Sequence, residues 1–480
     1  MGAYDQLRRR LEARLGRDGV IGDPVGRLLY EYDGGVDRAM PDLVAFPRSQ
    51  DEVVAVVKMA REAGVPLIPR GAGTGLSGGA VAREGGIILS LNRMRGILEV
   101  NVEDMRARVE PGVVNLEFSD QIAATGFYFV PDPSSQKACT IGGNVAENSG
   151  GPHTLAYGVT VNHVTGLDIV LPDGECATVG GKTAETRGYD LTGLLVGSEG
   201  TLAVVTAITV KLTRRPEAAR TLLAIYDQAE QAAATVSAIT AEGIIPAALE
   251  MFDGFSLRAV EAYVHAGYPL DSAAVLLIEV EGLEEEVEEQ AAAIERVCAR
   301  AGARETRRAA DEAQRARLWM GRKHAFGAMG RLCPNFYVMD GVIPRTKIGP
   351  VLAGIERISQ DCGLRVGNIF HAGDGNLHPL VFFDGRQAGQ FEAARAASEA
   401  IIRLCVEMGG SITGEHGVGM EKDGLMSLIF SEADLDFMRA IKQVFNPQQQ
   451  LNPGKLLPTY RSCRETALAT APGAEAAVRP

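Results

Sequence analysis

The spacing of hydrophobic residues changes repeatedly along this chain, and the changes predict a fold that mixes helices and strands. A helical period begins after Ser49, with Glu52 in capping-box register, and strand patterns follow at 65–68 and 86–91. Alternation over 167–170 and 175–178, separated by a Pro-Asp-Gly turn, predicts a hairpin. Another run rich in β-branched residues ends at Leu212. From about residue 38 to 216, helix and strand signals are therefore mixed.

Beyond an Arg-Arg-Pro break at 214–216, the pattern becomes more regular. Strand signals at 221–226, 274–279, 337–343 and 381–383 are each followed by a long helical pattern, as at 347–361 and 391–408. This spacing predicts an α+β domain with helices over a mainly antiparallel sheet. We expect a helical lead-in at 1–37, a first domain at 38–216, a second at 217–456 and a flexible tail at 457–480.

Three glycine-rich segments interrupt these elements. The first, at 69–79, places five glycines in eleven residues directly after a strand, so that backbone N–H groups can converge on phosphate oxygens. In a nicotinamide-binding fingerprint the glycines would open a helix, whereas here they lead to another strand. The second segment, at 131–158, has little helical or strand period, and the third, at 197–205, enters a strand. A single such loop is as often an ordinary turn, but three suit an extended cofactor.

Composition narrows the class of protein. A length of 480 residues exceeds the size of a single core, which fits two domains. The formal net charge of −13 argues against nucleic acid or an anionic membrane as a direct partner. We find no signal peptide pattern and no apolar run near the roughly twenty residues of a membrane span. The seven cysteines are scattered without Cys-x-x-Cys spacing, so we expect a cytoplasmic protein with no iron–sulfur cluster of its own.

The three segments, in this order, resemble the FAD-binding domain of the vanillyl-alcohol oxidase type, which p-cresol methylhydroxylase shares. HAGDGNLH at 371–378, GEHGVG at 414–419 and NPGK at 452–455 resemble the D-2-hydroxyacid dehydrogenase branch of that superfamily. Within the branch, the stretches GRKHAF, YVMDGVIPR, IIPAALEM and VHAGYP are similar to the flavoprotein subunits of bacterial glycolate oxidases. The resemblance runs from about residue 33 to about residue 456.

The resemblance implies a first domain that binds FAD and a second that covers the substrate. In covalent members of the superfamily a His stands where this chain has Thr74, so we expect noncovalent FAD. The residues expected to bind it are Pro69, Arg70, Gly71, Ala72, Gly73, Thr74, Gly75, Gly79, Pro131, Asp132, Ser135, Thr140, Ile141, Gly142, Gly143, Asn144, Gly150, Gly151, Tyr157, Glu199, Gly200, Thr201, Leu202, Val205, Ile208 and Asn452.

The histidine motifs carry the candidate chemistry. Two imidazoles and a carboxylate can bind one face of a divalent ion and leave positions open for a chelating 2-hydroxy acid. A lone His more often satisfies buried carbonyl groups, but the resemblance implies that His371, His378 and Glu415 bind a metal such as zinc, manganese or iron. It also implies His416 as the catalytic base and Arg322 as the catalytic residue that binds the substrate carboxylate. An ordinary helix-surface role for Arg322 stays open.

The expected reaction is FAD-dependent oxidation of glycolate or D-lactate to glyoxylate or pyruvate. Dehydrogenases of the longer 2-hydroxyglutarate carry polar residues where this chain has Phe326, Val338 and Leu380, so a short substrate is favoured. Less favoured functions are those of a D-2-hydroxyglutarate or different D-2-hydroxyacid dehydrogenase, a sugar or aldonolactone oxidase, and a non-catalytic flavoprotein subunit. The resemblance further implies a second flavin-domain subunit and an iron–sulfur subunit as partners, with electrons passing toward quinone and indirect association with the inner membrane.

Overall fold

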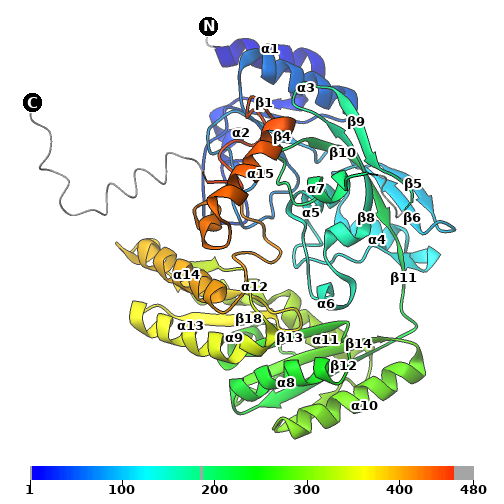
Figure 1. The fold of residues 1–480 in the computed structure, drawn as a ribbon, viewed down its shortest axis with the longest axis vertical. Helices are drawn as coiled ribbons and strands as arrows, with labels where there is room; N and C mark the ends of the chain where they lie inside the picture. The colour runs from blue at the N-terminus through cyan, green and yellow to red at the C-terminus, as the bar shows by residue number, and fades with distance from the viewer. Residues whose placement is uncertain (1–2, 184–187, 459–480) are drawn as a thin grey trace, which may run out of the picture.

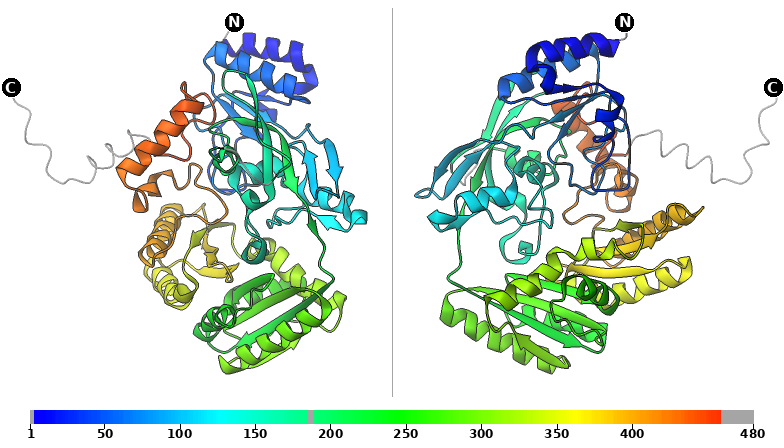
Figure 2. Two further views of the ribbon diagram at one scale, coloured as in Figure 1. Left: turned by 45° about the vertical axis from the view of Figure 1, so that its right-hand side comes forward. Right: turned by 180° about the vertical axis from the view of Figure 1, so that it is seen from behind.

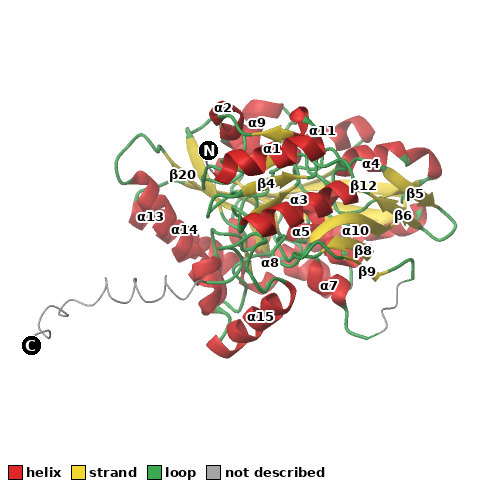
Figure 3. Cartoon of the chain, turned by 90° about the horizontal axis from the view of Figure 1, so that it is seen from above, coloured by secondary structure: helices red, strands yellow, loops and turns green. Residues whose placement is uncertain are grey.

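A computed structural model describes residues 3–183 and 188–458, so the predicted tail lies almost entirely outside the described residues. Two halves lie one above the other in Figure 1, the first drawn in blue to cyan and the second in green to yellow. Helices and strands are interleaved along the chain (Figure 3). This mixture confirms the predicted α+β class.

The first half contains two larger sheets and a small antiparallel pair formed by β7 and β11. A four-stranded sheet in the order β1-β2-β4-β3 pairs β2, β4 and β3 in parallel, and α1 packs on α3 next to it. A five-stranded antiparallel sheet has the order β5-β6-β10-β8-β9, and its β8–β9 pair is the predicted hairpin. The elements are α1 (Ala3–Leu15), β1 (Val20–Ile21), α2 (Pro24–Leu28), β2 (Leu43–Ala45), α3 (Gln50–Ala63), β3 (Leu67–Arg70), β4 (Ile87–Ser90), β5 (Ile97–Asn101), β6 (Arg106–Val109), α4 (Asn115–Gln121), β7 (Phe127–Tyr128), α5 (Ile141–Glu147), α6 (Thr154–Tyr157), β8 (Val164–Val170), β9 (Cys176–Gly180), α7 (Leu191–Leu195), β10 (Val204–Lys211) and β11 (Thr213–Arg214).

The second half is built on a nine-stranded sheet in which every pairing is antiparallel, as predicted. Its main order is β15-β12-β14-β13-β18-β19-β17, and β20 joins β18 to β16. The strands are β12 (Ala218–Tyr226), β13 (Ala248–Asp253), β14 (Ala274–Gly282), β15 (Glu305–Arg308), β16 (Asn335–Val338), β17 (Gly341–Val342), β18 (Val366–His371), β19 (Asn376–Leu377) and β20 (Pro379–Phe383).

Helices cover both faces of this sheet. Along β12, Leu222 and Ala224 belong to one hydrophobic cluster and Leu223 and Ile225 to another, because successive side chains point to opposite faces. Burial on both faces explains why β12 is apolar throughout 222–226 and β14 throughout 274–278. The first cluster includes residues of α8 (Ala229–Ala241), α10 (Glu284–Arg300), α13 (Ile348–Cys362) and α14 (Gln390–Glu407), and the second includes residues of α9 (Gly254–Val264), α11 (Glu312–Lys323) and α12 (Ala325–Met329).

The C-terminal segment returns to the first half. After α14 the chain crosses back, and α15 (Glu432–Phe445) lies beside the first half in Figures 1 and 2. Leu451 then forms a parallel bridge with Leu67, and the Leu67 N–H donates to the Gln450 carbonyl at 2.9 Å. The predicted second domain runs to residue 456, whereas this last part of it packs on the first half. The domain limits themselves stay a prediction.

The segment at 131–158 is not a plain loop. It contains α5, whose N-cap Thr140 accepts a hydrogen bond from the Gly143 N–H at 3.2 Å, and the short helix α6. Both helices are too short, and α5 too rich in glycine, to give a recognisable hydrophobic period. The segment therefore looks structureless in the sequence although it is ordered by capping and packing.

An ionic cluster joins the two halves beside α6. The His153 ring bonds through Nδ1 to Asp132 Oδ2 at 2.8 Å and stacks on Trp319 of α11, with ring centroids 6.0 Å apart. Its Nε2 lies 3.9 Å from carboxylate oxygens of both Glu279 and Glu281 on β14. Although burial opposes protonation, Asp132 and the two glutamates raise the pKa of His153 well above its usual value. His153 is therefore a cation that bridges the halves.

We predict that His153→Gln destabilises the protein in a pH-dependent way. A raised pKa gives stability that is fully present below the unfolded value near 6.5 and is lost as pH rises through the folded value. At pH 6 we expect a loss of about 1.5 to 3 kcal/mol, the range for hydrogen bonds to charged groups. Denaturant unfolding of both proteins between pH 6 and 10 is the measurement. A difference that stays constant over this range would contradict the assignment of a charged His153.

Candidate functional site

A cavity of about 810 Å³ lies between the two halves, and all three glycine-rich segments line it. From the second half it is lined by residues around α11 and α12, by β16 and by residues at 415–421. The predicted cofactor residues that line it are Pro69, Arg70, Gly71, Ala72, Gly73, Thr74, Gly75, Gly79, Ser135, Thr140, Gly142, Gly143, Asn144, Glu199, Gly200 and Val205. Those that do not are Pro131, Asp132, Ile141, Gly150, Gly151, Tyr157, Thr201, Leu202, Ile208 and Asn452.

The first two glycine-rich segments fit closely against each other at the cavity wall. A Cβ at Gly71 would collide with Thr140 Oγ1, and Gly73 has a φ of 72°, a conformation that favours glycine. Asn452 supports the loops from behind, because its side-chain amide donates to the Gly79 carbonyl at 2.9 Å and to the Glu199 carbonyl at 2.7 Å. The wall is thus backbone-rich and held from outside, which suits the close approach of an extended cofactor.

Three predicted metal ligands meet at the edge of this cavity. His371 Nε2 lies 3.1 Å from Glu415 Oε1, and His378 Nε2 lies 2.9 Å from the same oxygen. The three ligand atoms lie within 4.8 Å of one another. Although burial opposes ionisation, the two imidazoles hold the pKa of Glu415 well below its usual value. The arrangement is compatible with one divalent cation facing all three side chains.

The other nitrogen of each imidazole is held by a second group. His371 Nδ1 lies 2.7 Å from Glu250 Oε1, and His378 Nδ1 lies 3.2 Å from the Met339 carbonyl. Such contacts fix the ring orientation and leave Nε2 free to bind a metal, as in known metal sites. Glu250 stands opposite His371 in the β13–β18 register. We did not predict Glu250 from the sequence, and the only signal was an acidic residue inside the apolar run IIPAALEMF.

Arg322 is buried behind the group formed by His371, His378 and Glu415 and does not line the cavity. Only 2% of it is exposed, its Nε donates to Glu250 Oε2 at 2.5 Å, and its Nη2 lies 3.3 Å from His371 Nδ1. Its neighbour Lys323, at the end of α11, does line the cavity. The role of Arg322 in binding a carboxylate stays a prediction, and its charge is already paired with Glu250.

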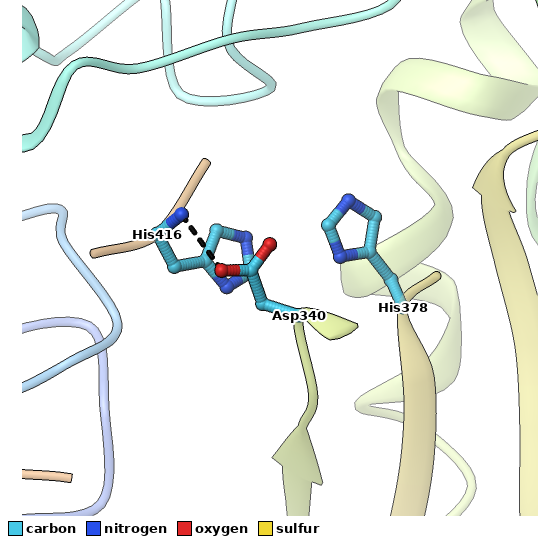
Figure 4. A group of neighbouring side chains, drawn as sticks. All are labelled: Asp340, His378 and His416. Carbon is cyan, nitrogen blue, oxygen red and sulfur yellow. Dashed lines mark hydrogen bonds between the residues drawn. The ribbon is translucent and has the colours of Figure 1, made fainter. Parts of the chain in front are cut away.

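Two buried carboxylates hold the GEHGVG loop. Asp340 accepts backbone N–H groups of Gly414, Glu415 and His416 at 3.0 to 3.1 Å, and Figure 4 shows the His416 bond. The Lys422 ammonium pairs with Asp340 at 3.0 Å. From the first half, Glu199 accepts the N–H groups of residues 418 and 419 at 2.7 and 2.8 Å. Sequence reasoning missed Asp340, although it lies inside the quoted stretch YVMDGVIPR.

The predicted base His416 lies against His378 and Glu415 of the candidate ligand group. Its ring stacks on His378 (Figure 4), with centroids 4.9 Å apart and planes 9° apart. Its Nε2 is 4.0 Å from Glu415 Oε1. Its Nδ1 is buried without a hydrogen-bond partner among the described residues. Burial lowers the pKa of His416 to about 4. The imidazole is therefore neutral at pH 7 and keeps a lone pair for a proton, although a pKa this low makes it a weaker base than an exposed histidine.

Two of the three residues predicted to favour a short substrate line the cavity. Phe326 and Val338 face it together with Phe336 and Tyr337, whereas Leu380 is fully buried in β20 and does not line it. Phe326, Phe336 and Val338 therefore give the cavity apolar lining residues, whereas Leu380 can act only by packing behind Phe326 and Val338.

Comparison with known proteins identifies the class. A profile described as FAD binding domain matches residues 41–180, and one described as FAD linked oxidases, C-terminal domain, matches residues 215–456. Among solved structures, p-cresol methylhydroxylase with substrate bound superimposes with a TM-score of 0.82 at 17% identity, covering 95% of this chain and 97% of that one. The 4-ethylphenol oxidase of Gulosibacter chungangensis gives a TM-score of 0.78 at 18% identity, with coverages of 96% and 98%. The chain belongs to the FAD-linked oxidases.

Several curated relatives are similar to this chain over most of their own length. The glycolate oxidase subunit GlcD of Escherichia coli strain K12 is 48% identical over 91% of this chain and 88% of its own length. GlcD of Bacillus subtilis is 42% identical, with coverages of 90% and 92%, and the D-lactate dehydrogenase of Anaerostipes hadrus is 32% identical, with coverages of 91% and 94%. Within the described residues, no helix is both long and apolar enough to cross a membrane.

We predict that Asp340→Asn destabilises the protein strongly, because it leaves the buried Lys422 ammonium without a counter-charge. Breaking a buried pair typically costs about 3 to 5 kcal/mol. Asp384→Asn on the same half is the matched control, since Asp384 pairs with the exposed Arg386 and should change stability little. Denaturant unfolding tests both variants. Equal losses of stability in the two variants would contradict a larger contribution from the buried Asp340–Lys422 pair.

Proposed function

We propose that the chain oxidises a short 2-hydroxy acid, glycolate or D-lactate, to the corresponding 2-oxo acid with FAD as the oxidant. The observation that carries the proposal is the meeting, at one cavity, of the FAD-binding loops with the His371, His378 and Glu415 group. The names of the glycolate oxidase and D-lactate dehydrogenase relatives support the substrate class. The apolar wall formed by Phe326 and Val338 supports a short substrate.

Oxidation removes a hydride from C2 and a proton from the hydroxyl group. FAD, when bound, supplies the hydride acceptor. A divalent cation held by His371, His378 and Glu415 supplies a Lewis acid, which makes an alcohol proton easier to remove. His416 takes that proton at Nε2, because this atom faces the ligand group and the imidazole is neutral.

The remaining residues orient and enclose the substrate. Glu250 orients His371, and Asp340 with Glu199 fixes the loop that carries Glu415 and His416. Arg322 holds the substrate carboxylate in this proposal, which requires it to share its guanidinium between Glu250 and the substrate. Phe326 and Val338 exclude water from the reacting carbon. A sugar oxidase or a non-catalytic subunit would have no use for this combination.

FAD is held noncovalently in this proposal, because the position that carries the covalent His in other members is Thr74, which lines the cavity. Thr cannot form the His–flavin bond. Acid precipitation should therefore release the flavin into the supernatant, measured by its absorbance. A yellow pellet with a colourless supernatant would contradict noncovalent binding.

We also propose that electrons leave through partner subunits, one with a second flavin domain and one with an iron–sulfur cluster, toward quinone at the inner membrane. The word subunit in the relatives' names supports an assembly. Within the described residues the six cysteines are dispersed over both halves, which offers no cluster site on this chain. Purification from the native host of this chain alone, with full quinone-linked activity, would contradict the proposal.

We predict that His416→Ala lowers kcat by roughly two to four orders of magnitude, the range for losing a general base. FAD content should stay normal. Arg322→Ala should mainly raise KM, because it removes a binding contact. The measurement is anaerobic stopped-flow reduction of the flavin by glycolate and by D-lactate, which also separates the two substrates. Near-normal bleaching in the His416→Ala enzyme would remove His416 from the base role.

We predict that Glu415→Gln lowers bound divalent metal by at least about tenfold and slows flavin reduction, because the oxygen shared by both histidines loses its charge. Glu407→Gln, on the exposed face of α14, is the control. Elemental analysis and stopped-flow reduction are the measurements. A chelator should slow reduction of the unmodified enzyme, and added metal should restore it. Indifference to chelation, with no metal present, would remove the metal from the proposal.

A further inference from the structure

Glu147, at the end of α5, is a cavity carboxyl that no part of the proposed mechanism uses. It lines the cavity together with the glycine-rich loops. Its Oε2 has no accessible surface and no hydrogen-bond partner among the described residues. A Cβ at Gly79 would approach Glu147 Oε1 to 2.6 Å, so glycine leaves the room that this side chain occupies. An unsatisfied carboxyl inside a ligand cavity needs an explanation.

A second carboxyl converges on the same point. A Cβ at Gly417 would collide with Glu147 Oε2 and lie 2.9 Å from Glu199 Oε1. Two carboxyl groups that approach one point in a buried site disfavour each other's ionisation and raise each other's pKa. Glu199 accepts two backbone N–H groups, which favour its anionic form, whereas Glu147 has no such donor among the described residues. The proton of the pair therefore belongs on Glu147.

The two nearby lysine ammonium groups bond to other acceptors and form no ion pair with Glu147 among the described residues. The Lys455 ammonium donates to the carbonyls of Gly79 and Val81 and to Asn452 Oδ1, and the Lys422 ammonium is held by Asp340 and the Gly417 carbonyl. Asp33 adds a further negative charge nearby. Burial, together with Glu199 and Asp33, raises the pKa of Glu147 well above its usual value.

We propose that Glu147 is a further cofactor-binding residue, which donates a hydrogen bond from its neutral carboxyl group to an acceptor atom of the flavin ring. The ring offers carbonyl oxygens and unprotonated nitrogens as acceptors. An uncharged donor suits these atoms, whereas the cavity cations Arg38 and Arg70 suit the phosphates. Because reduction adds negative charge to the ring, this donor stabilises reduced flavin more than oxidised flavin and so raises the midpoint potential.

The test compares Glu147→Gln, which keeps a neutral donor, with Glu147→Leu, which removes it. FAD affinity of the apoprotein is measured by flavin fluorescence, and the midpoint potential of the bound flavin by reductive titration with a reference dye. Glu147→Leu should bind FAD roughly threefold to tenfold more weakly, the effect of one net hydrogen bond, with a lower potential. Glu147→Gln should stay within about twofold of the unmodified protein at pH 7. Glu117→Gln, on the exposed side of α4, is the control.

A pH series gives a second readout that does not need the leucine variant. The affinity of the unmodified protein for FAD should fall as pH rises through the raised pKa of Glu147, and Glu147→Gln should remove this fall. Equal pH dependence in the two proteins, or unchanged affinity and potential in Glu147→Leu, would overturn the proposal. A lower melting temperature of Glu147→Leu with an unchanged flavin potential would also overturn it, in favour of a purely structural role. None of these measurements depends on the substrate.

Discussion

The site depends on the satisfaction of backbone N–H groups by two buried carboxylates. Asp340 takes three of them at 414–416 and Glu199 takes two at 418 and 419, so nearly the whole GEHGVG loop is fixed by ionic hydrogen bonds. The two carboxylates come from different halves of the chain. The loop that carries Glu415 and His416 is therefore positioned relative to the FAD-binding loops as well as to the second sheet. Charged acceptors make these bonds stronger than ordinary backbone pairs.

Much of the fold follows from local pattern. The long helices α13 and α14 were predictable because their apolar period persists over several turns, and the β8–β9 hairpin because its turn residues are specific. The strand β13 was missed, since a short apolar run containing Glu250 fits several structures until its partners are known. The return of the C-terminal segment to Leu67 is a long-range contact without a local signal.

The candidate site, too, contains residues that the sequence predicted and residues that it did not. His371, His378 and Glu415 were predictable because their motifs resemble those of a known family, and the structure brings all three together. Glu250 and Asp340 were not predicted as site residues, because each acts through a partner far away in the chain: His371 and the 414–416 backbone. For Arg322 the sequence indicates the residue type but not its pairing with Glu250. Which charged groups pair with each other is decided by the tertiary structure, so local sequence patterns do not predict it.

The return of residues 446–458 to the first half has a consequence for biosynthesis. Leu451 sits in the core beside Leu67, and Asn452 and Lys455 support the Gly79 loop from behind. The FAD-binding half therefore lacks part of its own interior until nearly all of the described chain has left the ribosome. Domains usually fold in order as they emerge. Here the first half must wait for residues 446–458 to be made, so FAD can be captured tightly only after the second half has been synthesised.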